Sequence, residues 1–436
     1  MANSSILDLQ EFKQYRAAFR SRVQTLTHRA SYYDGSVYSK VRNQLGWLSP
    51  RVFKEIKPLF LPLNRAVDVD CGIVPGGWEI SEEEPKKEQW EQARDFLFDQ
   101  SHWDTEGVLY VHYGAQYGVS GLFIADIREE SRVILQPVDP TKFMLIGARY
   151  GVNAEMSIYI EYRSGVEYAE VTTADEIRTF IDGKSAGHDD RPPIYANSLG
   201  MVPYVEVRHM ETGEVLGECT FQKAMIILDE VNRLGTQLAG AISKNTDPQW
   251  AIMGAEPGEL TNNGEYVWFF PAGTDAKVLV PGIDIDGILS FIQTIADNVD
   301  KALPETAFDE LKSKDRIATA TIELQLAELV LKIKRVRPNY DRGLVSALQM
   351  AGIAGKQMNI SELAPLDDLE LTLDRDREIL PMDPETRIKL RLLELELEQL
   401  ELAAMDPPEV EEEADDDADV DDDKGKNKKD EEEEWS

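Results

Sequence analysis

Apolar side chains recur at helical spacing in the N-terminal part of the chain. In residues 8–30, six apolar side chains lie three or four positions apart, which is typical of one face of an amphipathic helix. The same spacing places Trp90 and Leu97 on one face of residues 88–100. The pattern predicts helices over residues 8–30, 51–70, 88–100 and 106–118.

The period changes to two near residue 120, where short runs of β-branched and aromatic residues alternate with turns. Such runs are typical of an antiparallel sheet. We therefore expect residues 120–216 to form a mainly β module that follows the helices. The predicted strands cover residues 121–126, 133–138, 156–162, 166–171, 176–181 and 204–209.

Helical spacing returns in the second half of the chain, so the pattern as a whole predicts the α+β class. Pro338 is expected to end or kink the long helix at 318–337, because proline has no amide hydrogen to donate. The predicted helices here cover residues 221–245, 287–302, 318–337, 344–351 and 384–404, with short strands within 249–283 and at 369–373.

The charge of the chain is strongly negative and unevenly distributed. The 81 acidic and 46 basic residues give a formal net charge of −35. Residues 406–436 hold 17 acidic and four basic residues and almost no apolar ones, so this tail is predicted to be disordered. Two stretches reverse the sign: residues 8–65 carry +7 and residues 311–342 carry +4. This distribution argues against a protein that wraps DNA. It does not argue against a protein past which DNA moves.

The composition and the motif search exclude several classes. The two cysteines, Cys71 and Cys219, are far apart, so neither a zinc site nor a disulfide framework is expected. The N-terminus lacks the pattern of a signal peptide, and no apolar run reaches the ~18–20 residues of a membrane span. We therefore expect a protein that stays inside the cell or is assembled there. None of the five histidines lies in a metal-binding motif, and no nucleophile elbow occurs, so we predict no catalytic residue, metal or cofactor.

One segment resembles part of the phosphate-binding loop motif. Residues 235–241 read GTQLAGA, but Ala241 stands where the motif requires lysine, and the segment lies inside a predicted helix. Small residues let two helices approach closely, whereas a glycine costs a helix about 1 kcal/mol. We therefore assign Gly235, Ala239, Gly240 and Ala241 to packing of this helix.

Two groups of basic side chains stand out in residues 311–342. Lys312, Lys314 and Arg316 lie in a polar stretch before a predicted helix, where they could touch a polyanion. Residues 332–337 hold four more, at the expected end of that helix. Positive charge at a helix C-terminus contributes about 0.3–1 kcal/mol, and we prefer this interpretation of the second group to DNA contact.

Eight short stretches, taken in their order along the chain, carry a family resemblance. They are YYDG at 32–35 with PLNRAVDVD at 62–70, GVSGLFI at 118–124 with VDPTKF at 138–143, MVPYVEV at 201–207 with LDEVNRL at 228–234, and LPETAF at 303–308 with ATATI at 318–322. With the order of helices and strands, they resemble the portal proteins of tailed bacteriophages over roughly residues 30–400. Their order carries the resemblance, since each stretch is short.

The resemblance implies a ring of identical subunits, a dodecamer in the assembled particle, at one vertex of the capsid. Double-stranded DNA would enter and leave through the axial channel of this ring. The implied protein partners are the large subunit of the packaging terminase, the head-completion or adaptor proteins, and the major capsid or scaffolding protein. The implied location is the virion, with the host cytoplasm during assembly.

The resemblance also divides the chain into the regions of a portal subunit. The implied regions are a wing at 1–215 with a long helix at 318–350, stem helices at 216–247 and 286–303, a clip at 248–285, a tunnel loop at 304–317, a crown at 351–405 and the acidic tail at 406–436. The implied site residues are Lys312, Lys314 and Arg316 at the DNA channel, and Trp250, Tyr266, Trp268 and Phe269 at the clip interface.

Two other functions stay open at this point. A nucleic-acid-processing enzyme, such as a metal-dependent nuclease, needs carboxylates that hold a divalent metal, and acidic residues are frequent here. A virion adaptor or scaffold that binds only proteins would need no channel. A ring with a central hole favours the portal hypothesis over both, whereas a monomer that cleaves DNA favours the nuclease.

Overall fold

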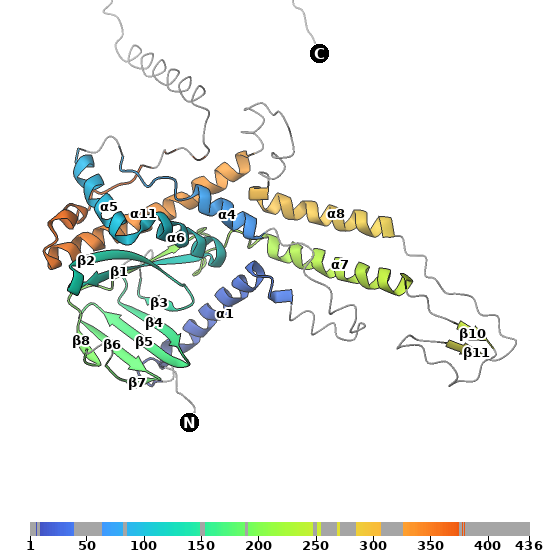
Figure 1. Ribbon diagram of the computed structural model, residues 1–436, viewed down its shortest axis with the longest axis horizontal. Helices are drawn as coiled ribbons and strands as arrows, with labels where there is room; N and C mark the ends of the chain where they lie inside the picture. Colours follow the sequence, from blue (N-terminus) through green and yellow to red (C-terminus); the bar gives the residue numbers. More distant parts are fainter. Residues whose placement is uncertain are drawn as a thin grey trace, which may run out of the picture. The chain divides into compact units, whose positions relative to one another are not determined.

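The protein was analysed as a computed structural model, and its described residues all lie in one of two units. The chain divides into residues 1–380 and 381–436. The second unit, with the expected helix at 384–404 and the acidic tail, lies outside the described residues. Figure 1 shows the elements of the first unit. The described residues are 6, 9–38, 63–81, 85–148, 153–187, 191–246, 251–253, 268–270, 285–306, 326–374, 377 and 379.

The N-terminal helices follow the apolar pattern of the sequence. Helix α1 begins later than expected, since a 3-10 turn, η2, precedes it, and it buries Phe19 and Leu26 of the predicted apolar face. Gly118 has a φ of 84°, which favours glycine, and it ends α6 directly before the first strand. The elements are η2 (Lys13–Tyr15), α1 (Arg16–Tyr33), α4 (Leu63–Ile73), α5 (Lys87–Ser101) and α6 (Trp103–Tyr117).

The β module predicted for residues 120–216 consists of two antiparallel sheets. The first has the order β2-β1-β9, with β1 (Val119–Ile127), β2 (Arg132–Val138) and β9 (Tyr204–Arg208). The second has the order β3-β4-β5-β6-β7, and β8 also pairs with β6. All six predicted strands are confirmed. The strands of the second sheet are β3 (Phe143–Ile146), β4 (Met156–Arg163), β5 (Val166–Thr173), β6 (Glu176–Ile181), β7 (Lys184–Ser185) and β8 (Ile194–Ala196).

The two sheets meet at Gly121 of β1. A Cβ atom at this position would lie 2.2 Å from Cζ of Phe143, which begins β3. The Phe143 ring stacks on Tyr204 of β9, with ring centroids 5.9 Å apart. The absence of a side chain at Gly121 therefore lets an aromatic ring of the second sheet pack on the first.

After the β module, two long helices run antiparallel and pack against each other (Figure 1). We call α7 (Ala224–Thr246) and α8 (Ile285–Ala302) the helix pair. Between them in the sequence, β10 (Ala251–Met253) and β11 (Trp268–Phe270) form a parallel pair. A 3-10 turn, η4 (Pro304–Thr306), follows α8. Both helices and the two short strands agree with the predicted positions.

Helix α11 (Ala327–Met358) does not end at Pro338, which lies inside it. Pro338 is exposed, so water can reach the carbonyl group that loses its hydrogen bond there. A 3-10 helix, η5 (Ser361–Leu366), follows. The predicted strand at 369–373 is wrong: only Leu373 makes an isolated bridge, to Ile80, and Leu369 is 93% exposed.

The largest hydrophobic core joins the sequence-distant halves of the first unit. It includes side chains of α5, α6, β1, β2, β9, α11 and η5. A second core joins the helix pair to α4 and α6, and a third packs the start of α1 on the second sheet. The described residues thus form a mixed helical and sheet protein, as the predicted α+β class requires.

Candidate functional site

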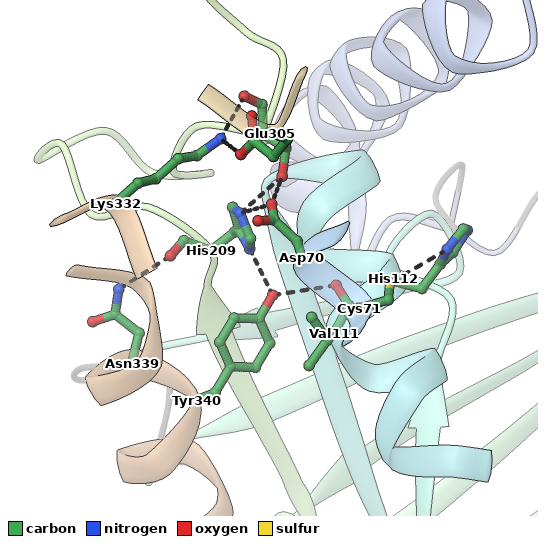
Figure 2. Close-up of polar contacts among 10 residues, drawn as sticks. Asp70, Cys71, Val111, His112, His209, Glu305, Lys332, Asn339 and Tyr340 are labelled. Atoms are coloured by element: carbon green, nitrogen blue, oxygen red, sulfur yellow. Dashed lines mark hydrogen bonds and ion pairs between the residues drawn. The ribbon is translucent and has the colours of Figure 1, made fainter. Parts of the chain in front are cut away.

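A buried ion pair lies where the helix pair joins the rest of the protein. Glu305 lies in η4, directly after α8, and Thr220 lies four residues before α7. Lys332 of α11 forms an ion pair with Glu305 and donates a hydrogen bond of 3.2 Å to the carbonyl oxygen of Thr220 (Figure 2). One ammonium group therefore binds both chain segments that connect to the helix pair.

The network continues through α4 to the end of β9. The Thr220 hydroxyl donates to Oδ2 of Asp70, a fully buried residue of α4. Nε2 of His209, the residue after β9, lies 3.0 Å from Oγ1 of Thr220 and 3.4 Å from Oδ2 of Asp70. Asp70 and His209 are both closed off from solvent. Two segments far apart in the sequence are therefore fixed to the start of the helix pair.

The other side of the His209 ring contacts α11. Nδ1 of His209 lies 2.9 Å from the Tyr340 hydroxyl, and Asn339 donates a 3.2 Å hydrogen bond to the His209 carbonyl oxygen. One assignment of protons satisfies both ring nitrogens of His209 and the Thr220 hydroxyl. In it, Tyr340 donates to Nδ1 at 2.9 Å rather than to the more distant carbonyl oxygen of Val111 at 3.4 Å, Nε2–H donates to Thr220, and Thr220 donates to Asp70. This assignment requires a neutral imidazole, and burial does lower the pKa of His209.

Burial and nearby charges set the ionisation of the three charged groups. Burial acts to raise the pKa of Asp70, but the Lys332 charge and the His209 and Thr220 hydrogen bonds together lower it. Burial and then the Asp70 charge raise the pKa of Glu305 to about 7, against the opposing effect of Lys332. Burial acts to lower the pKa of Lys332, yet both carboxylates together raise it. Near neutral pH, Asp70 and Lys332 are therefore charged and Glu305 titrates.

The arrangement serves to join chain segments. Asp70, His209 and Glu305 are fully buried, and the Lys332 side chain is 12% exposed, so no solvent-borne substrate reaches them. Truncating one partner of a buried ion pair typically costs about 3–5 kcal/mol, because the other charge stays buried without compensation. The network is a candidate site for holding the helix pair in place, and its chemistry is structural.

Cys71 and His112 form the second polar pair shown in Figure 2, with Sγ and Nδ1 3.9 Å apart. Burial raises the pKa of the Cys71 thiol to about 12, with Asp70 and Asp68 adding to the effect. Burial also lowers the pKa of His112. Both groups are therefore neutral at physiological pH, and the pair lacks the thiolate and imidazolium of a cysteine nucleophile. Cys71 and Cys219 are both free thiols; Cys219 is buried and Cys71 is half-buried.

The site residues predicted from the sequence are only partly described. Lys312, Lys314 and Arg316 lie outside the described residues, as do Trp250 and Tyr266. Gly235 is buried in α7, and Ala239, Gly240 and Ala241 continue that helix. Trp268 and Phe269 lie in β11, where they pair with Ala251 and Ile252. Among the described residues, the hydrogen bonds and ion pairs of the buried network involve none of these predicted residues.

The basic residues at 332–337 do not lie at a helix end, so this interpretation is wrong. Helix α11 runs twenty residues or more beyond them, to Met358. Lys332 and Arg337 are directed inward: Arg337 donates to the carbonyl oxygens of Ile73 and Arg377. Lys334 and Arg335 are exposed. Two of the four basic side chains in this stretch therefore make contacts inside the protein.

Some of the basic side chains in residues 8–65 are also buried. Arg22 of α1 forms an ion pair of 2.7 Å with Glu206. Arg29, one heptad later, donates to the carbonyl oxygens of Tyr117 and Gly217. Both arginines are buried. Arg22 attaches α1 to β9, and Arg29 attaches it to the end of α6 and to Gly217, so neither arginine contributes to a DNA-binding surface.

Sequence reasoning missed the network because its members come from distant segments. One signal was present: Lys332 lies on the apolar face of its helix, next to Ile333 and between Leu329 and Val336. Asp70 has a similar position, after the buried pair Ala66 and Val67. A charged residue on an apolar face requires a buried partner, although the sequence does not say which residue that partner is.

The sequence matches no known protein-family model, and a comparison with curated proteins finds no match. Among the described residues, no group of three or more histidine, cysteine, aspartate or glutamate side chains is placed to hold a metal ion. In the part of the chain that the structure describes, no helix has the length and apolar character needed to cross a membrane.

Proposed function

We propose that the protein is the subunit of a phage portal ring. In this proposal the ring occupies one vertex of the capsid and forms the channel through which double-stranded DNA is packaged and ejected. The helix pair is the stem, and the residues between its two helices are the clip. The clip binds the large terminase subunit and later the head-completion proteins, while the capsid or scaffolding protein surrounds the ring.

One observation carries the proposal. The chain leaves the β module at Thr220, forms α7, β10, β11 and α8 in that order, and returns at Glu305. The network around Lys332 holds the two ends of this segment, Thr220 and Glu305, together. A portal stem and clip have this order, and a stem whose two ends share one attachment point keeps a fixed position relative to the wing.

The charges also support a conduit. A channel wall must not hold DNA, because each phosphate that is neutralised adds salt-sensitive affinity. The net charge of the chain is −35. Helix α8 of the helix pair also carries exposed negative charge, at Asp286 and Asp297. Acidic residues outnumber basic ones by 81 to 46, and Lys312, Lys314 and Arg316 are the group that we assign to contact with DNA.

Negative-stain imaging of the purified full-length protein tests this proposal, combined with a DNA-cleavage assay in the presence of Mg²⁺. We expect rings with a central hole and no cleavage. A monomer that cuts DNA would assign the protein to the nucleases. A compact oligomer without a hole would favour an adaptor or scaffold that binds only proteins.

A further inference from the structure

The two ends of the helix pair are attached to the rest of the protein in different ways. Before α7, the amide of Thr220 donates a 2.9 Å hydrogen bond to the carbonyl oxygen of Ala115. The Thr220 carbonyl oxygen accepts from Lys332, and its hydroxyl group contacts both Asp70 and His209 (Figure 2). The backbone and the side chain of one uncharged residue thus hold the start of α7.

After α8, Glu305 makes the attachment through one carboxyl group. Lys332 binds its Oε1 atom, whereas its Oε2 atom is buried and makes no hydrogen bond with any described residue. Asp70 Oδ1 is also buried and, among the described residues, has no hydrogen-bond partner. An ionised carboxylate can only accept hydrogen bonds, so this site has fewer donors than two ionised carboxylates need. A proton on Glu305 adds one donor and removes one negative charge.

The charges around Glu305 are balanced when Glu305 is protonated. Asp70 and Lys332 then carry one charge of each sign. Loss of the Glu305 proton leaves two carboxylates and one ammonium group in a place closed off from solvent. An unbalanced buried charge is strongly unfavourable. Burial and the Asp70 charge accordingly raise the pKa of Glu305 to about 7, so this group gains and loses its proton near neutral pH.

The other titratable groups of the site keep their charge state near neutral pH. Burial lowers the pKa of His209 and raises that of Cys219 to about 11, so both are neutral. Against the effect of burial, the Lys332 charge lowers the pKa of Asp70, and the two carboxylates raise the pKa of Lys332, so both stay charged. The elements packed against η4, which are α4, α8 and α11, also carry the half-buried Arg65 and the exposed Asp68, Lys301 and Glu328.

The chain around Glu305 permits a local movement. Helix α8 ends at Ala302, and Pro304, which has no amide hydrogen, separates it from Glu305. Leu303 is fully buried in the core that α8 shares with α4 and α7, so it can hold α8 while Glu305 moves. Glu305 and Thr306 can therefore turn toward water without unwinding α8.

We propose that one proton controls the polar attachment of α8. While Glu305 is protonated, η4 stays against α4 and α11. When Glu305 loses the proton, η4 separates and the carboxylate is hydrated, whereas Thr220 keeps the start of α7 in place. The end of α8 then loses its contact with Lys332 and keeps the apolar contacts of Leu303. This control of one end of the helix pair does not depend on the proposed ring.

Hydrogen–deuterium exchange of the full-length protein between pH 5 and pH 8 tests this inference, with mass spectrometry as the readout and correction for the intrinsic exchange rate. The Thr306 amide, which donates to the Leu303 carbonyl oxygen, reports on η4, and the Thr220 amide reports on the start of α7. The pKa of Glu305 is about 7 when η4 is attached and has its ordinary value of 4.5 in water. The opening constant of η4 should therefore rise about 70-fold over this range and level off above pH 7, while that of Thr220 stays constant.

The matched variants are Glu305→Gln, which keeps the shape of the side chain but cannot ionise, and Asp297→Asn, which removes an exposed carboxylate of α8. We expect η4 to stay attached at every pH in Glu305→Gln and to follow the wild type in Asp297→Asn. A corrected exchange rate at Thr306 that does not change with pH in the wild type would overturn the inference, whether or not a variant folds. The same pH dependence in Glu305→Gln would also overturn it, as would a parallel rise at Thr220, which would show that both ends open together.

Discussion

Lys332 of α11 forms a buried ion pair with Glu305, the first acidic residue after α8 outside the helix pair. The same ammonium group binds the carbonyl oxygen of Thr220, just before α7. The two ends of the helix pair are therefore attached to one side chain of the longest described helix. Asp70, 0% exposed, supplies the second negative charge that keeps Lys332 ionised in this buried position.

Replacing Lys332 by methionine should destabilise the protein by about 3–5 kcal/mol, because Asp70 and Glu305 then lose the charge that compensates them. The control is Lys334→Met, an exposed lysine on the same helix, which should change the free energy of unfolding by less than about 0.5 kcal/mol. Urea unfolding of both variants measures the difference. Equal losses in the two variants would contradict the role given to Lys332.

Glu305 should make stability depend on pH. Its pKa of about 7 in the folded protein exceeds the ordinary value of 4.5, so the unfolded chain releases this proton first as the pH rises. The contribution of Glu305 to stability is therefore largest below pH 4.5 and is lost as the pH rises through 7. Between about pH 5 and pH 8, the wild type should lose roughly 1–3 kcal/mol relative to Glu305→Gln.

The measurement is the free energy of unfolding of both proteins across this pH range. The other titratable groups are present in both proteins, so the difference between the two curves reports the titration of Glu305, including its interaction with Asp70 and Lys332. Parallel curves would show that Glu305 is ionised or protonated equally in the folded and unfolded states.

Gly114→Ala should destabilise the protein because Tyr340 crosses α6 at this position. A Cβ atom on Gly114 would lie 1.7 Å from the Tyr340 hydroxyl oxygen, and both residues are buried. Overpacking of this kind costs about 1–3 kcal/mol. Gly72→Ala is the matched control, since no atom lies within 4 Å of its added Cβ. It should leave stability unchanged or raise it by up to about 1 kcal/mol. Thermal unfolding that ranks the two variants in the opposite order would refute this packing.

Changing Lys312, Lys314 and Arg316 together to alanine should lower the amount of DNA packaged or retained, without loss of ring assembly. The reason is the removal of three cations from the proposed channel of a protein whose net charge is −35. Packaged DNA per particle is the quantity to measure, beside images of the rings. A double variant of the exposed Lys334 and Arg335 controls for general loss of positive charge. Normal packaging in the triple variant would remove these residues from the DNA contact.

Long periodic segments were predictable from the sequence. The helix expected at 88–100 is Lys87–Ser101, and that expected at 221–245 is Ala224–Thr246. Each has enough turns for the apolar period to be clear. Strands β7 and β8 were not predictable, because two or three residues show no period. The false strand at 369–373 shows that alternation of apolar residues does not provide a neighbouring strand to pair with.

The buried network was beyond prediction for two reasons. Thr220, His209 and Glu305 meet only through tertiary packing, which the local pattern does not contain. The sequence pattern places Lys332 near a helix end, because Pro338 is expected to end or kink the helix. Because Pro338 is exposed, water can reach the carbonyl group four residues earlier that loses its hydrogen bond, so the helix continues and Lys332 falls on its buried face. Because the end of this helix is predicted too early, the sequence does not predict that Lys332 is buried in the network.

Single-particle cryo-electron microscopy of the purified full-length protein tests the central claim most directly. We predict a closed ring of identical subunits, a dodecamer as the resemblance implies, in which the helix pairs surround an axial channel wide enough for double-stranded DNA. A monomeric particle, or an oligomer in which the helix pairs do not surround a channel, would contradict the account.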